Sequence, residues 1–375
     1  MLRKLFFALF LIIIHPGSCS FNKAQTQLFS EPEWKDSKRL KNTKRIVIAS
    51  THNFKGAILY EHVKFSAPGG RVNYKLKVGG VSILKTYLDI LKYRYSNDLL
   101  LLDTGNLFNL DDNVKGLNHY REHRKVLQIY EEMGYDAVNL TDVDYRALKI
   151  INPMSHKIPF ITSNIINLEK NKPISEFGVA PYKIINKNGV KVGLIALTSF
   201  EKILPHTIQS FRGIYFEDPI LSFLKTKKIL KQKGVKILIL MSSVKSFFEL
   251  KNLVKRLPPN SVDVIVSGNT YTAEKQILGI PLMQNSGRGQ YLSRIEFHLD
   301  ARDNIILKDL TKKSDLTKIC HNFFKQTMDC HSHHIKELSE ERVKLIAQSN
   351  YEIIPAIFLG HEIKKNPHVE NLINK

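Results

Sequence analysis

Short apolar runs alternate with longer amphipathic stretches along most of the chain. Runs such as "RIVIAS" have the length and β-branched content of buried strands. Stretches such as "GGVSILKTYLDILKYRYS" place apolar residues every three or four positions, as one face of a helix requires. The expected strands are 45–50, 99–108, 158–165, 182–197, 236–243 and 263–270, and one more strand is expected directly after Gly134. The expected helices are 79–96, 121–134, 219–234, 316–350 and 366–375. This alternation predicts an α/β protein.

Turn residues divide these elements at defined points. The dipeptide Asn188-Gly189 splits 182–197 into a hairpin, because both residues tolerate the positive φ angles that a two-residue turn needs. Pro219 near the start and Gly234 just past the end bound one helix. The chain therefore reads as short, punctuated elements, without an internal repeat or a low-complexity tract.

The strand 263–270 ends in a turn that offers little reactive chemistry. Ligand-binding residues of α/β enzymes commonly follow the carboxyl ends of such strands. After Gly268 come Asn269, Thr270 and Tyr271, which include no histidine, carboxylate or thiol. The turn therefore lies where a functional site is expected, but its residues lack the side chains that catalysis commonly uses.

The first residues have the pattern of an export signal. Arg3 and Lys4 precede the apolar run 5–14, which is shorter than the roughly 20 residues that a bilayer-spanning helix needs. Small residues and Cys19 follow in "HPGSCS", which is typical of a bacterial lipoprotein processing site. We expect 1–18 to be a signal peptide and Cys19 to carry a lipid. Ordinary cleavage near Cys19 is the alternative.

The segment that follows has the composition of a tether. Residues 19–43 are polar and rich in lysine. We therefore expect an exported protein of the bacterial cell envelope, either bound to the membrane through a lipid anchor or periplasmic. Its partners in that setting are the membrane and an unknown protein or anionic ligand.

The net charge of +21, from 56 Lys and Arg against 35 Asp and Glu, does not by itself predict nucleic-acid binding. The basic residues are spread along the chain, without clustered arginines or interleaved aromatic residues. We attribute the charge to a general drift in composition towards Lys, Ile and Asn, and expect no nucleic-acid partner. With 43% hydrophobic residues the chain can bury a large core.

Two cysteines remain beyond the export region. Cys320 and Cys330 lie ten positions apart, and disulfides persist in exported proteins. We expect them to form a bridge that closes a short loop. Each is followed by histidine, as in a haem attachment site, but neither has the partner cysteine three residues earlier. Covalent haem is therefore not expected, and a redox or haem role is the weakest of the functions considered.

An ordered set of segments between about residues 44 and 300 resembles the 5′-nucleotidase branch of the calcineurin-like metallophosphoesterases. The segments are "STHNFKG", "VGGVSILKTY", "LLDTGNLF", "MGYDAVNL", "IPFITSNI" and "PYKIINKNGVKVGLIALTS". The resemblance implies a metallophosphoesterase-like domain over 44–300 that forms a four-layer α/β/β/α sandwich. We expect a helical C-terminal extension with the cysteine pair over 301–375, and no separate nucleoside-binding domain.

The resemblance also implies a two-metal site, and the matched positions have lost its ligands. The family's metal-ligand positions fall on Asn53, Lys55, Asn106, Asp142, Ser243, Asn269 and Tyr271, and its catalytic acid falls on Val143. Two dications about 4 Å apart repel by roughly 17 kcal/mol at an effective dielectric constant of about 20. A single carboxylate cannot offset that repulsion, and Lys55 adds to it. We expect no metal cofactor, or at most one weakly bound ion.

Three histidines are candidates to restore a metal site, and each also has a structural interpretation. His52 lies one position from a lost ligand, and His119 and His123 are spaced to share one helix face. We interpret His52 as a turn residue and the pair as part of a solvated basic face.

These observations favour a non-catalytic member of the family, anchored in the envelope, with a binding or scaffold role. The alternative is an active hydrolase of nucleotides or other phosphate esters that works through a remodelled single-metal site. For the vacated cavity we expect Lys55 to occupy the space of a metal and to pair with Asp142, with the amides of Asn53, Asn106 and Asn269 completing the hydrogen bonds.

Overall fold

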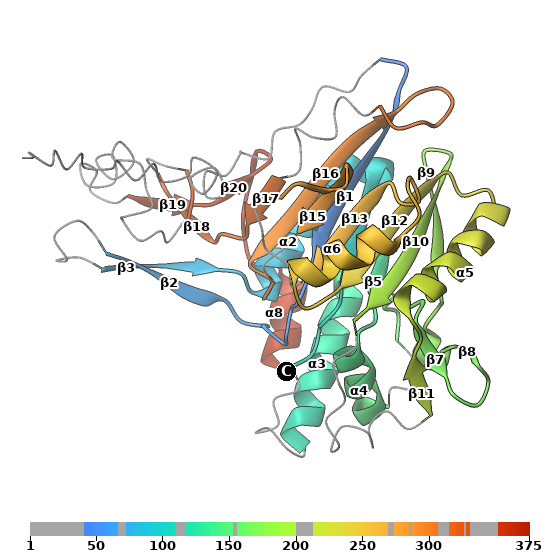
Figure 1. Ribbon diagram of the computed structural model, residues 1–375. Helices are drawn as coiled ribbons and strands as arrows, with labels where there is room; N and C mark the ends of the chain where they lie inside the picture. Colours follow the sequence, from blue (N-terminus) through green and yellow to red (C-terminus); the bar gives the residue numbers. More distant parts are fainter. Residues whose placement is uncertain are drawn as a thin grey trace, which may run out of the picture.

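The computed structural model describes residues 41–66, 73–109, 117–152, 156–199, 213–268, 274–284, 287–306, 315–325, 328–330 and 352–375. Two six-stranded sheets lie face to face at its centre (Figure 1). The first sheet has the order β17 (Asp315–Lys318), β16 (Tyr291–Leu299), β1 (Lys44–Thr51), β4 (Leu99–Asp103), β5 (Ala137–Asn139) and β6 (Phe160–Ile161). The second has the order β14 (Gln276–Ile277), β15 (Ile280–Gln284), β13 (Val264–Gly268), β12 (Ile237–Ser243), β10 (Val190–Thr198) and β9 (Lys183–Lys187).

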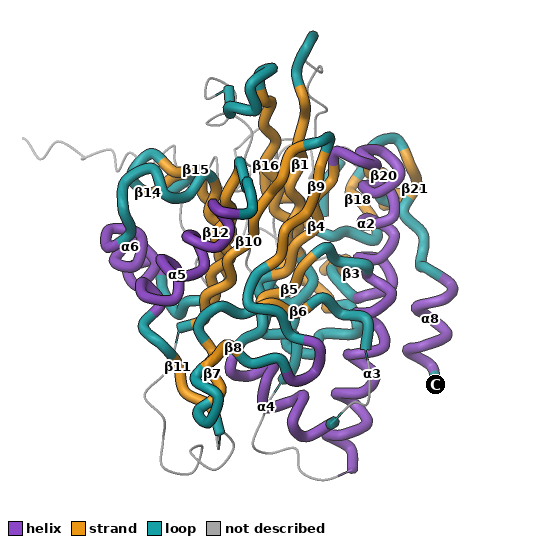
Figure 2. Tube along the Cα trace, turned by 90° about the vertical axis from the view of Figure 1, so that its right-hand side faces the viewer, coloured by secondary structure: helices purple, strands orange, loops and turns teal. Residues whose placement is uncertain are grey.

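Helices cover the outer face of each sheet (Figure 2). The first sheet carries α2 (Val81–Tyr95), α3 (Leu117–Met133), α4 (Asp142–Ile151) and α8 (Pro367–Asn374). The second carries α5 (Pro219–Gln232) and α6 (Phe247–Arg256). This is the four-layer α/β/β/α sandwich that the resemblance implied.

Period-two alternation along the strands builds the layers. Ile46 and Ile48 of β1 enter the core between the two sheets, while Val47 and Ala49 face the helices. In β12, Ile239 joins the core between the sheets and Leu240 packs under α5 and α6. Because both faces of each sheet are covered, these strands read as continuous apolar runs in the sequence.

Smaller elements complete the structure. They are the hairpin of β2 (Glu61–Ser66) with β3 (Asn73–Val78), the sheet of β11 (Ile214–Phe216), β7 (Ile165–Asn167) and β8 (Lys172–Pro173), the pair β18 (Asn322–Phe324) with β19 (Ile353–Pro355), and the pair β20 (Ile357–Phe358) with β21 (His361–Glu362). Two 3₁₀ turns cover Ser96–Asp98 and Glu176–Gly178. In Figure 1 the β2–β3 hairpin projects from the body.

Local signals fixed several boundaries as expected. The hairpin turn at Asn188-Gly189 has φ angles of 53° and 81°, and β9 pairs with β10 around it. Helix α5 begins at Pro219, behind the N-cap Asp218, whose side chain accepts hydrogen bonds from the backbone. Helix α6 was missed, although Ser246 caps it by accepting from the backbone N–H of Glu249 and gives it a readable start signal.

The helix expected over 316–350 is wrong in the residues that the structure describes there. Residues 315–318 form β17, which pairs antiparallel with β16 along the edge of the first sheet, and 322–324 form β18. Their local sequence does not separate strand from helix, and strand partners from elsewhere in the chain decided both elements. Residues 331–351 lie outside the described residues. The last helix, expected over 366–375, is α8.

The predicted disulfide is present. Cys320 and Cys330 are bonded, with their Cα atoms 5.8 Å apart, and both residues are buried. The hydroxyl of Tyr87 in α2 lies 3.2 Å from the carbonyl oxygen of Cys320 and 3.3 Å from its amide nitrogen. The disulfide bond is therefore packed in the protein interior, next to α2.

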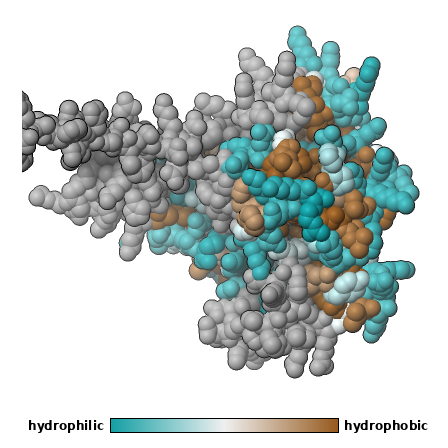
Figure 3. Space-filling view, in the orientation of Figure 1, coloured by the Kyte–Doolittle hydropathy of each residue, from teal (hydrophilic) through white to brown (hydrophobic). Residues whose placement is uncertain are grey.

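None of the helices among the described residues combines the length and the apolar content that crossing a bilayer needs. Hydrophobic patches lie among hydrophilic ones on the face shown in Figure 3. Phe248 of α6 is the most exposed of the large hydrophobic residues on that helix, at 74%. Cys19 and the expected signal peptide and tether up to residue 40 lie outside the described residues.

Candidate functional site

The turns that follow β1 and β4 are joined by backbone hydrogen bonds. The amide of Asn53 donates to the carbonyl of Gly105 at 2.9 Å, and the amide of Lys55 donates to the carbonyl of Asn106 at 2.9 Å. Because β1 and β4 are parallel neighbours, both turns lie at the same edge of the first sheet. Lys55 and Asn106 therefore sit side by side, although 51 positions separate them in the sequence.

These turns have backbone conformations that few residues adopt. Asn53, Lys55 and Asn106 have φ angles of 53°, 50° and 61°, in the left-handed region. Asparagine visits this region readily, whereas lysine does so at a cost of about 1–2 kcal/mol. The neighbouring turn supplies the hydrogen bonds that hold Lys55 in place.

The buried carboxylate of Asp144 stabilises the turn that contains Asn106. Asp144 accepts hydrogen bonds from the backbone amides of Asn106 at 2.9 Å and Leu107 at 2.7 Å. It also forms a capping box with Thr141 at the start of α4. Burial raises the pKa of Asp144 to about 6, against the lowering effect of these hydrogen bonds. Asp144 is thus the residue that ties α4 to the turn.

A second buried carboxylate lies at the end of β4. Asp103 accepts from the hydroxyl of Thr51, from the amide of Gly105 at 2.7 Å and from the hydroxyl of Tyr130 at 3.1 Å. Burial raises the pKa of Asp103 to about 7, with a further contribution from Asp144. Asp103 and its hydrogen-bond donors thus form a buried polar cluster beneath the site, and none of them lines the cavity described next.

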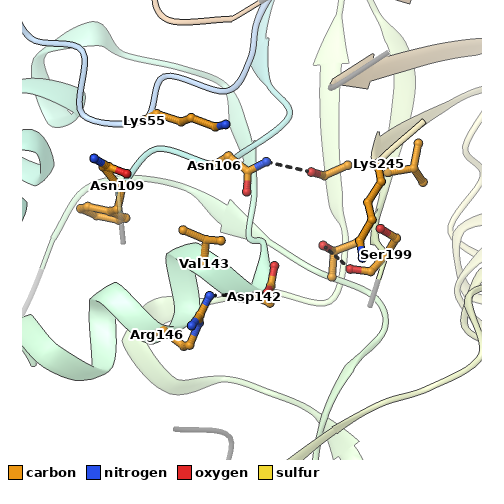
Figure 4. A pocket seen from close by; sticks show the side chains of 12 residues that line it. Lys55, Asn106, Asn109, Asp142, Val143, Arg146, Ser199 and Lys245 are labelled. Carbon is orange, nitrogen blue, oxygen red and sulfur yellow. Dashed lines mark hydrogen bonds and ion pairs between the residues drawn. The ribbon is translucent and has the colours of Figure 1, made fainter. Parts of the chain in front are cut away.

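The cavity itself lies where the carboxyl ends of both sheets meet. It has a volume of about 310 Å³. Its lining residues, shown in Figure 4, are Lys55, Asn106, Phe108, Asn109, Asp142, Val143, Arg146, Thr198, Ser199, Ser243, Val244 and Lys245. The first sheet and α4 supply one wall, and the loops behind β10 and β12 supply the other. The matched positions that the structure describes are therefore brought together here, Asn53 excepted.

The expected pairing of Lys55 with Asp142 is wrong. Lys55 is exposed, and none of the described carboxylates lies within ion-pair distance of it. Asp142 instead faces Arg146, one turn later on α4, at 3.9 Å (Figure 4). Burial raises the pKa of Asp142, and the charges of Arg146 and Lys245 oppose that rise. Asp142 belongs to the first turn of a helix, so its partner comes from its own helix face.

His52 does not serve as a ligand in the cavity either. Its imidazole is buried, lies 2.7 Å from the hydroxyl of Thr104, and packs against Gly268. A Cβ atom on Gly268 would lie 1.8 Å from His52 Nδ1. The turn behind β13 therefore begins with glycine because a ring from the opposite sheet occupies the side-chain position.

The second histidine interpretation needs a correction. His123 of α3 is buried, and its ring stacks on Phe108 with centroids 5.2 Å apart. It therefore does not belong to a solvated basic face, because it packs against the floor of the cavity. The side chain of His119 lies outside the described residues, as do Asn269 and Tyr271.

The described donor set does not fit a two-metal centre. Asp142 is the only carboxylate among the described residues that line the cavity. No group of three or more His, Cys, Asp or Glu side chains suited to a metal ion occurs in the part of the chain that the structure describes. Three cationic side chains stand in the same cavity and repel a dication. We therefore derive no reaction step that passes through a metal.

The amide of Asn106 is oriented as a donor. Its Oδ1 accepts from the hydroxyl of Thr141 at 3.0 Å, and its Nδ2 points to Ser243 Oγ at 3.5 Å. A metal ligand would need the oxygen turned towards the cavity. The polar lining therefore presents nitrogen and hydroxyl donors where the family would present metal-binding oxygens.

Sequence reasoning missed several residues that line or support the site. It assigned no role to Arg146, Lys245 or Asp144. A readable signal existed for Arg146, which follows Asp142 by one helical turn. No comparable signal existed for Lys245, because its position depends on how the second sheet packs on the first.

Comparison with known proteins gives a consistent family. The chain is 25% identical to the 5′-nucleotidase of Rattus norvegicus over 262 residues, which cover 63% of this chain and 43% of the rat protein. It therefore spans less than half the length of this curated relative. A scan against models of protein families found no match.

Solved structures share the fold. The 5′-nucleotidase precursor from Thermus thermophilus superposes with a TM-score of 0.55 and 20% identity, over 74% of this chain and 55% of that one. The calcineurin-like phosphoesterase YfkN from Bacillus subtilis gives a TM-score of 0.52 and 18% identity, over 74% of this chain and 91% of that one. At these identities the likeness establishes the sandwich architecture.

Proposed function

Because the chain belongs to the calcineurin-like metallophosphoesterases and is related to their 5′-nucleotidase branch, we propose that it is a non-catalytic member that uses this fold for binding. The observation that carries the proposal is the composition of the cavity. Where the family chemistry needs acidic and imidazole ligands, the described positions hold Lys55, Asn106, Ser243 and the single carboxylate Asp142. Val143 stands at the position of the acid and has no proton to transfer.

The remaining groups do not replace the lost machinery. A general base must lie free to take a proton from the attacking water. Asp142 lies 3.9 Å from Arg146 and faces Lys245. Its ionised form therefore interacts with these cations and is not free to accept a proton from water. His52 and His123 are packed into the protein interior and do not line the cavity.

Elemental analysis and an activity assay test this proposal together. We expect purified protein to hold less than stoichiometric metal and to leave nucleotides and simple phosphate esters intact in Mn²⁺. Stoichiometric metal together with Mn²⁺-dependent hydrolysis would overturn it and establish the alternative, a hydrolase with a remodelled single-metal site. In that case Asp142→Ala should abolish the hydrolysis, because Asp142 is the one carboxylate among the described residues that line the cavity.

We further propose that the protein acts in the bacterial cell envelope as a lipoprotein. The apolar run 5–14, the small residues before Cys19 and the polar segment 19–43 support this. The Cys320–Cys330 disulfide is compatible with an exported protein. Labelling with a radioactive fatty acid tests it: label should be incorporated into the wild-type chain and be lost in Cys19→Ser. Equal labelling of both would refute lipidation at Cys19.

A further inference from the structure

Three cationic side chains from three separate segments share the cavity. Lys55 comes from the turn behind β1, Arg146 from α4 and Lys245 from the loop between β12 and α6. Figure 4 shows their charged ends directed into the same space from three sides. Among the described residues that line this space, Asp142 is the only acidic one. The described lining therefore carries three cations and one carboxylate, an excess of positive charge.

The neutral lining has the donors that an oxyanion requires. Asn106 is about nine-tenths buried and turns its Nδ2 group towards Ser243. Ser199 and Ser243 add hydroxyls, and Asn109 adds an amide, on the same cavity surface. Charge-assisted hydrogen bonds from such groups to phosphate oxygens are about twice as strong as neutral ones.

The size and the apolar part of the lining indicate that a bare ion does not fill the cavity. Its volume of about 310 Å³ is at the small end of the range for organic ligands. Phe108, Val143 and Val244 give the wall an apolar portion. An occupant that fits both parts has a compact anionic group joined to an organic group.

We propose that this cavity binds the phosphate group of an organic phosphate monoester without any metal, held by Lys55, Arg146 and Lys245. These side chains supply the positive charge that a metal pair would otherwise provide. The inference rests on the proposed function, because a bound ester persists only if the protein does not hydrolyse it. The absence of a proton donor at Val143 accounts for that persistence.

Asp142 has a defined part in this arrangement. It lies between Arg146, at 3.9 Å, and Lys245, whose charge acts on it. In the absence of a ligand it partly neutralises both cations, and a bound phosphate competes with it for them. Removing this carboxylate should therefore strengthen phosphate binding, whereas removing a lysine should weaken it.

Isothermal titration calorimetry with phenyl phosphate in the presence of EDTA tests the proposal. We expect saturable binding that is at least about tenfold weaker in Lys245→Met and in Lys55→Met, which corresponds to the loss of one charge-assisted contact. Asp142→Asn should bind at least about threefold more tightly. Lys228→Met, which removes an exposed lysine of α5 outside the cavity, should bind as the wild type does.

Two further probes set the ligand class. Inorganic phosphate should bind more weakly than phenyl phosphate, because it leaves the apolar wall uncovered. Benzoate, which carries the same ring on a carboxylate, should bind at least about tenfold more weakly than phenyl phosphate. Equal binding of benzoate and phenyl phosphate, or unchanged binding in Lys245→Met with a native circular dichroism spectrum, would overturn the proposal.

The same samples separate this inference from the proposed function. Hydrolysis of phenyl phosphate in Mn²⁺ would contradict the non-catalytic role, whatever the binding in EDTA. No hydrolysis together with no binding in EDTA would contradict the phosphate site alone. Binding in EDTA without hydrolysis in Mn²⁺ supports both.

Discussion

Replacing Gly268 with alanine tests how the two sheets meet at the site. The added Cβ would lie 1.8 Å from Nδ1 and 1.9 Å from Cε1 of His52, where ordinary contact begins at 3.4 Å. His52 cannot swing aside into solvent, because it is only 2% exposed and its ring lies 2.7 Å from the hydroxyl of Thr104. Gly268 does not have a positive φ angle, so the effect of the substitution is one of packing and not of backbone strain.

The cost follows from the depth of this overlap. Overpacking a well-filled core costs typically about 1–3 kcal/mol, and an overlap with a buried ring belongs at the upper end of that range. We expect Gly268→Ala to lower the free energy of unfolding by about 3 kcal/mol. In a His52→Ala background the clash is gone, and the same substitution should cost less than about 1 kcal/mol.

Urea denaturation followed by circular dichroism measures both costs in the four variants of a double-mutant cycle. A coupling energy of about 2 kcal/mol between positions 52 and 268 is expected. Additive effects of the two substitutions would show that His52 does not occupy the space over Gly268. A neutral Gly268→Ala variant would refute the packing of the two strand ends described above.

Three other predictions concern the framework of the site. Asp144→Ala leaves the buried amide of Asn106 without its acceptor and should lower the free energy of unfolding by about 3–5 kcal/mol in urea denaturation; a loss below about 1 kcal/mol would contradict its anchoring role. Because burial raises the pKa of Asp103 from 3.8 to about 7, the stability it contributes is complete below about pH 4 and is lost as the pH rises through about 7. Thermal unfolding at about pH 5 and about pH 8 measures this, and Asp103→Asn should flatten the profile. Reducing the bond between Cys320 and Cys330 should lower the unfolding free energy by about 2–3 kcal/mol, and an unchanged urea midpoint would contradict that contribution.

Much of the fold was readable because its signals are local. Short apolar runs marked the strands, and the pair Asn188-Gly189 marked a turn whose geometry the residues themselves favour. The substituted ligand positions were readable for the same reason, since each follows a strand end at a fixed distance. The disulfide between Cys320 and Cys330 was predicted from their separation in sequence together with the export signal.

The strands after residue 314 were not readable in this way. The segments 315–318 and 322–324 have no pattern of their own that separates strand from helix. They became strands because β16 and β19 offer open edges with unpaired backbone groups. Edge pairing is a property of the assembled sheet, so a local window of sequence does not contain it.

The partners of the site residues were also decided by the tertiary structure. Asp142 was expected to pair with Lys55, but the first turn of α4 turns it towards Arg146, and the left-handed turn leaves Lys55 exposed. Lys245 reaches the same cavity from the second sheet, 190 positions along the chain from Lys55. The sequence alone determined which ligands are missing. Only the packing of one sheet on the other, which joins strand ends far apart in the chain, determined which charges meet where those ligands would be.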